Sequence, residues 1–109
     1  MGISNIDPRW SGFARYLQRL IERVQLEWDG ILKNSAVYPP RGSKVEIKFA
    51  LDSSGRISRI IKVDSTSSDQ GRTACLAALT DPMPYGAWTP EMIRLLGKEQ
   101  AITFTFLYQ

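Results

Sequence analysis

Few side chains in this sequence could carry out chemistry. It contains 11 acidic residues, one cysteine and no histidine. Ser–His–Asp triads, Cys–His pairs and metal sites built on clusters of histidine and cysteine are therefore excluded. The remaining candidates for acid or base catalysis are Asp52, Asp64 and Asp69. No defined spacing pairs them, and roles in turns and helix caps explain all three. We therefore expect a protein that is not an enzyme and that has neither a cofactor nor a metal site.

The single cysteine, Cys75, lies among apolar neighbours in the segment TACLAAL. A lone cysteine cannot form an internal disulfide bond. A cysteine in such surroundings is typically a small buried hydrophobic residue, whereas a reactive thiol needs a polar and accessible site. We expect Cys75 to belong to the core.

The length of 109 residues favours one domain, spanning residues 1–109, with one modest core. The net charge of +3 is mild, and neither a membrane-spanning apolar run nor a signal-peptide pattern is present. The opening MGISNIDPRW is typical of a start codon placed on a cut fragment. We expect residues 1–7 to be disordered or added, and the chain to be a soluble piece of a longer protein whose anchor or export signal has been removed. Whether the missing part carries a transmembrane helix stays open.

A long amphipathic helix is predicted after Asp7 and Pro8, which suit the N-cap and the first helical position. Three arginines, Arg15, Arg19 and Arg23, follow one another on its polar face at four-residue steps. They form either a solvated face or a basic strip used in docking. The apolar side chains recur every three or four residues: Phe13, Tyr16, Leu17, Leu20, Ile21, Val24, Trp28, Ile31 and Leu32.

The segment SKVEIKFALDSSGRISRIIKV predicts a β-hairpin. Its first strand alternates apolar and polar residues, so one face should be buried and the other wet. The turn DSSG, residues 52–55, places Gly55 where a positive φ is needed. The return strand, residues 56–63, should bury Ile61 and Val63. Its alternation slips at Ile60, which indicates either a bulge or a second covered face. The buried residues of the first strand should be Val45, Ile47, Phe49 and Leu51.

Two shorter helices and a last strand complete the pattern. QGRTACLAALT should form a helix capped by Ser68 or Asp69, and TPEMIRLLG a helix that begins after Thr89 and ends at Gly97. The closing AITFTFLYQ should be a strand. The order helix, strand, strand, helix, short helix, strand predicts an α+β fold with a three-stranded antiparallel sheet covered on one face by helices.

Several of these segments resemble the TonB/TolA C-terminal domain family. KFALDSSGRISRIIKV is similar to the family's hairpin, TACLAAL to the small-residue helix that follows it, and VYPPRG to the Tyr-Pro that opens TonB-type domains. YLQRLIERVQLEW and PEMIRLLGKEQAITFTF are similar to the opening helix and the ending of TolA-type domains. The resemblance covers residues 13–108.

The chain departs from the family pattern in two places. Cys75 stands where TolA-type domains carry the helix cysteine of a disulfide bond, but the first strand offers no partner. The long segment that TonB-type domains place before the first strand is reduced to PRGSK. The choice between TonB type, TolA type and a divergent third type therefore stays open.

The resemblance implies a binding module that performs no chemistry. Such domains lie in the periplasm at the end of a long linker anchored in the inner membrane. They bind an outer-membrane transporter or a Tol-type periplasmic protein and transmit force derived from the proton gradient, which serves transport and the cell envelope. We also expect a monomer or a weak dimer.

The last strand offers the candidate binding residues. If it lies at an edge of the sheet, a partner can add a strand through main-chain hydrogen bonds. Ile102, Phe104 and Phe106 should pack in the core, whereas the other face and the edge stay available. Surface aromatic residues near prolines could add anchors, although loop packing also explains them. The candidates are Ala101, Thr103, Thr105, Leu107, Tyr108, Tyr85, Trp88 and Tyr38.

A small nucleic-acid-binding α/β domain is the alternative. The sequence pI of about 9.2 is basic, and ITFTFLY is superficially similar to sheet aromatics that stack on bases. The clustered basic residues typical of nucleic-acid binding are missing, and core packing explains Phe104 and Phe106 more simply. We therefore expect a protein partner rather than a nucleic acid.

Overall fold

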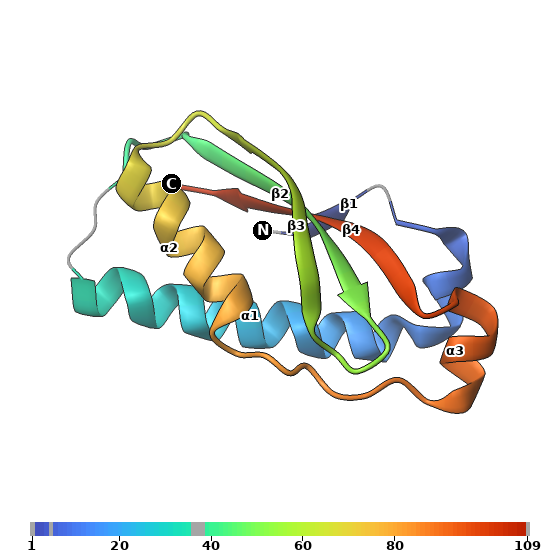
Figure 1. Ribbon diagram of the computed structural model, residues 1–109. Coiled ribbons are helices and arrows are strands. Elements are labelled where there is room, and N and C mark those ends of the chain that lie inside the picture. Colours follow the sequence, from blue (N-terminus) through green and yellow to red (C-terminus); the bar gives the residue numbers. More distant parts are fainter. Residues whose placement is uncertain (1, 5, 36–38, 109) are drawn as a thin grey trace.

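The computed structural model describes residues 2–4, 6–35 and 39–108, which form an α+β domain (Figure 1). A 3₁₀ helix, η1, leads directly into the long helix α1, and two shorter helices follow later in the chain. The helices are η1 (Pro8–Phe13), α1 (Ala14–Ser35), α2 (Asp69–Thr80) and α3 (Pro90–Leu96), and the strands are β1 (Gly2–Ser4), β2 (Lys44–Asp52), β3 (Ile57–Ser65) and β4 (Glu99–Leu107).

The sheet has four antiparallel strands in the order β1-β4-β2-β3, so the prediction of three strands is wrong. The additional strand is β1, which comes from the segment expected to be disordered. It pairs with β4 so that Gly2, Ile3 and Ser4 lie opposite Thr105, Phe104 and Thr103. Three residues are too few to show a strand period. Pairing with β4, and packing of Ile3 beside the core, therefore create this strand.

The helices cover one face of the sheet, and the core lies between them and the strands. Helices α1 and α2 pack against one another, and Figure 1 shows α1 extending along most of the length of the domain. Although α1 has 22 residues, no helix among the described residues is both long and apolar enough to cross a membrane. The largest fully buried side chains come from both layers: Trp10, Leu20, Val24, Val45, Ile47, Phe49, Leu51, Cys75, Leu79, Ile102, Phe104 and Phe106.

The hairpin of β2 and β3 follows its sequence pattern closely in one strand and less closely in the other. All four apolar residues predicted to be buried in β2 are fully buried. In β3 the register shifts near Ile60, since Lys48 pairs with Lys62 whereas Phe49 pairs with Ile60. Ile61 therefore has no direct partner and is 42% exposed, so the prediction that it is buried is wrong. The bulge and the outer position of β3 explain this exposure.

The predicted caps of the two shorter helices are confirmed, since Ser68 accepts a hydrogen bond from the Gly71 backbone and Thr89 accepts one from the Met92 backbone. Asp7 accepts a hydrogen bond from the Arg9 backbone, but it caps the 3₁₀ helix η1, because the long α-helix begins only at Ala14. Gly97 ends α3 with a φ of 83°. These local signals fix where the helices begin and end, and therefore where β4 enters the sheet.

Candidate partner-binding surface

The last strand is not at an edge of the sheet along its whole length. β4 lies between β2 and β1, and β1 occupies Thr103, Phe104 and Thr105 on the side where a partner strand was expected. However, β4 has nine residues and β1 only three. Within the described residues, no strand faces the remainder of this side of β4. Among the described residues, this edge of β4 is therefore paired with β1 in its middle part and unpaired at its two ends.

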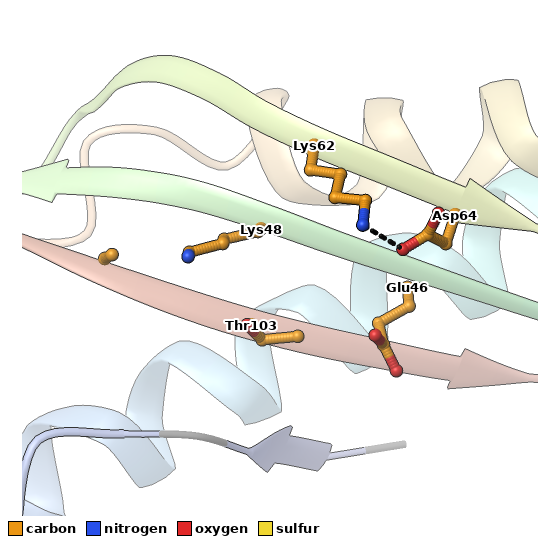
Figure 2. Close-up of a pocket in the computed structure, with 6 residues that line it drawn as sticks. Glu46, Lys48, Lys62, Asp64 and Thr103 are labelled. Atoms are coloured by element: carbon orange, nitrogen blue, oxygen red, sulfur yellow. Dashed lines mark ion pairs between the residues drawn. The ribbon is translucent and has the colours of Figure 1, made fainter.

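A polar groove of about 410 Å³ lies on the sheet face opposite the helices (Figure 2). Cross-strand register assembles it from three strands, since Lys62, Lys48 and Thr103 lie in one row of the sheet. The small side chain of Ala101 leaves space at one end of the groove. The lining residues are Glu46, Lys48, Lys62, Asp64, Ala101 and Thr103.

The charges of this groove are of both signs and incompletely paired. Lys62 Nζ lies 3.5 Å from Asp64 Oδ2, and the Thr105 hydroxyl donates to Glu46 at 3.5 Å. Lys48 is exposed and lies directly opposite Lys62, so two like charges face one another. No ion pair to Lys48 is found among the described residues. An incoming carboxylate could therefore pair with Lys48 and reduce this repulsion.

The two candidates at the end of β4 differ in their surroundings. Leu107 is 42% exposed and lines an apolar hollow together with Arg41, Gly42 and Tyr108. The Tyr108 ring is buried beside Trp28, with 5.0 Å between ring centroids. Leu107 therefore offers an apolar contact to a partner, whereas Tyr108 presents only a small part of its surface.

The Tyr108 hydroxyl is held by the core. It donates to the Gly71 carbonyl at 2.7 Å, accepts from Trp28 Nε1 at 3.3 Å and lies 3.3 Å from Cys75 Sγ. Burial raises the pKa of Tyr108 and raises the pKa of the Cys75 thiol to about 11. The expectation that Cys75 is a buried core residue is confirmed. Its thiol stays protonated at neutral pH.

The aromatic candidates outside β4 lie elsewhere in the fold. The Tyr85 hydroxyl donates to the Leu79 carbonyl, and the Arg23 guanidinium lies 5.5 Å from the Tyr85 ring centroid. Trp88 is 5% exposed and packs edge-to-face against Trp10 at 5.5 Å. These side chains belong to the helical side and do not line the groove of β4. Tyr38 lies outside the described residues.

The basic residues of α1 also separate into two roles. Arg23 donates to the carbonyls of Pro82 and Pro84 at 2.6 and 3.0 Å and so fastens the following loop to the helix. Arg15 and Arg19 are exposed. The three arginines therefore do not form one uniform basic strip, because the Arg23 guanidinium is hydrogen-bonded to the loop.

The aromatic residues of β4 that were considered for stacking on nucleic-acid bases lie in the core. Phe104 and Phe106 are fully buried and pack against one another at 4.9 Å between ring centroids. The open face carries charges of both signs rather than a basic surface. Its polar residues alternate with the buried ones along β2, which sequence reasoning recognised. The groove was missed because it depends on which residues of β2, β3 and β4 lie opposite one another.

Comparisons with protein-family models, with curated proteins and with solved structures give no significant match to this chain.

Proposed function

We propose that this domain is a protein-binding module that docks an extended segment of a partner on β4. The supporting observation is a nine-residue strand whose outer edge is paired over three residues in the part of the chain that the structure describes. Main-chain groups of such an edge bind an added strand, and alternate side chains select its sequence. The partly unpaired charges around Lys48 offer a second point of contact on the open face.

The cellular role that we propose follows from the resemblance to TonB/TolA C-terminal domains. In this role the domain is the periplasmic end of an energy transducer that is anchored in the inner membrane in the full-length protein. Its partner is an outer-membrane transporter or a Tol-type periplasmic protein, and the domain transmits force without catalysing a reaction. The α+β class, the hairpin and the helix caps of this chain are compatible with that proposal.

An NMR titration of the ¹⁵N-labelled domain tests the binding role. The probes are synthetic peptides that represent periplasmic loops and plug segments of outer-membrane proteins. We expect at least one peptide to shift the amides of residues 102–107 in a saturable manner. If none of the peptides shifts these amides, docking on β4 is wrong.

The variant Lys48→Ala separates the groove from the strand edge. It should weaken the binding of an acidic peptide several-fold, because it removes an exposed positive charge on the open face. Lys33→Ala is the matched control, since Lys33 is an exposed residue at the end of α1, on the helical side. Equal weakening by both variants would indicate only a nonspecific effect of net charge.

A further inference from the structure

The strand β1 is weakly attached for an element that completes a sheet. It contains three residues, one of which is glycine, and only Ile3 contributes an apolar side chain to the core. Gly2 and Ile3 are half-buried and Ser4 is exposed. No side-chain hydrogen bond or ion pair joins these three residues to the rest of the described chain. Such a segment can open without disturbing the core.

The other side of β4 is attached far more firmly. β2 pairs with all nine residues of β4, from Lys44 opposite Leu107 to Asp52 opposite Glu99. The side chains of Phe104 and Phe106 are fully buried. Loss of β1 therefore exposes one edge of a strand that stays fixed by its other edge. Because β2 holds β4 in place, another strand can pair with the edge that β1 leaves.

From these observations we propose that β1 is a placeholder strand: it occupies the edge of β4 until a strand of a partner protein displaces it and pairs with β4 instead. The inference rests on the proposed binding function and states how the edge becomes available. The partner segment runs antiparallel to β4, as β1 does. It extends beyond the three positions of β1, so it forms hydrogen bonds with residues of β4 that Gly2, Ile3 and Ser4 do not reach.

The contacts of β1 define the chemistry of the segment that replaces it. Ile3 lies opposite Phe104 and packs beside the core, whereas Gly2 and Ser4 lie opposite Thr105 and Thr103. Side chains alternate between the two faces of a sheet. The partner strand therefore carries an aliphatic residue at the central position, flanked by small residues that face Thr103 and Thr105.

The test uses the chain's own β1 as the probe, so that it does not depend on knowing the partner. A fluorescently labelled peptide with the sequence of residues 1–7, MGISNID, is titrated into the wild-type domain and into the variant Ile3→Asp. The variant places a charge beside the core and so releases β1. We expect at least tenfold tighter binding to Ile3→Asp, because the attached strand competes at high effective concentration in the wild type.

A peptide with aspartate at its third position is the matched control and should not bind. In Ile3→Asp, the wild-type peptide should shift the amides of Thr103, Phe104 and Thr105. Ile3→Ala should give an intermediate affinity, and it provides a second variant if Ile3→Asp disturbs the core amides. Equal affinity of the wild type and of both variants would overturn the proposal.

A disulfide bond that holds β1 on β4 tests the same proposal in the opposite direction, because it prevents β1 from leaving. The double variant Ser4→Cys/Thr103→Cys joins two residues that lie directly opposite one another, within the reach of a disulfide bond. When oxidised it should bind neither MGISNID nor any partner peptide at β4, and reduction should restore binding. If a partner peptide shifts the β4 amides equally in both redox states, strand exchange is wrong although the binding function stands.

If no partner peptide binds the wild type while MGISNID still binds Ile3→Asp, the placeholder stands and the proposed partner class is wrong. A second copy of the chain is the other possible occupant of the edge. A wild-type dimer in which β1 of one copy pairs with β4 of the other, detected by sedimentation and by the same disulfide forming between copies, would also overturn the proposal.

Discussion

The close approach of Gly55 to Gly86 provides a sharp test of how the loop of residues 81–89 is held. Gly55 has a φ of 81°, and a Cβ added there would collide with the Gly86 carbonyl oxygen and lie 2.7 Å from its backbone nitrogen. Two backbone hydrogen bonds also connect this loop with the β2–β3 turn. Tyr85 N donates to the Gly55 carbonyl at 2.7 Å, and Trp88 N donates to the Ser53 carbonyl at 2.8 Å. The change Gly55→Ala therefore pushes on backbone rather than on a flexible side chain.

Gly42 offers a matched control, because it has the same φ of 81° and nothing within 4 Å of an added Cβ. Alanine at a left-handed φ lowers the free energy of unfolding by about 1–2 kcal/mol. Alanine also makes the unfolded chain less flexible than glycine does, which raises the free energy of unfolding by up to about 1 kcal/mol. We therefore expect Gly42→Ala to lower the free energy of unfolding by about 1 kcal/mol. Gly55→Ala should cost about 2 kcal/mol more, since each of the two hydrogen bonds contributes about 1 kcal/mol.

Urea unfolding monitored by tryptophan fluorescence measures both variants under the same conditions. The amide shifts of Gly55→Ala should be largest in the loop that carries Tyr85 and Trp88. If both alanine variants lose the same free energy of unfolding, the contact between the β2–β3 turn and this loop does not stabilise the fold.

Three further predictions concern the core and the loop. Tyr108→Phe should lower the free energy of unfolding by about 2–3 kcal/mol in urea, because it leaves the Gly71 carbonyl and the Trp28 indole N–H unpaired; an unchanged midpoint would contradict this. Burial raises the pKa of Cys75 to about 11, so stability should be full below its ordinary pKa of 9.0 and fall as the pH rises toward 11. Thermal unfolding between pH 8 and 10 should show a smaller decline in Cys75→Ala, and an identical decline would refute this cause. Arg23→Lys should cost about 1 kcal/mol, since one ammonium group replaces a guanidinium that donates to two carbonyls; differential scanning calorimetry would detect it, and an unchanged melting temperature would count against it.

Patterns confined to one segment were predictable from the sequence. The alternation in β2 identified its four buried residues because side chains of a strand point to opposite faces with a period of two. The caps at Ser68 and Thr89 were predictable because a side-chain oxygen beside a helix start binds a backbone N–H of the first turn. The burial of Cys75 followed from its apolar neighbours.

Patterns in the outer strand were only partly predictable. The irregularity at Ile60 was visible as a break in alternation, and the structure has a register shift there. The exposure of Ile61 was not predictable, because a bulge changes which face the next residue reaches. The roles of Tyr85 and Trp88 were also undecided, since a loop aromatic is buried or exposed according to the elements that pack on it.

The sequence by itself determined the helices, the hairpin and the face of β4 that enters the core, because each depends on residues close together in the chain. Only the tertiary structure decided that β4 has neighbours on both sides. β1 has no period of its own and exists because β4 provides hydrogen bonds and a place for Ile3 beside Phe104. The groove around Lys48 also depends on the tertiary structure, since the register between strands places Lys62 on one side of Lys48 and Thr103 on the other. The edge of β4 is therefore partly paired by β1, and we propose that the exchange of β1 governs what binds there.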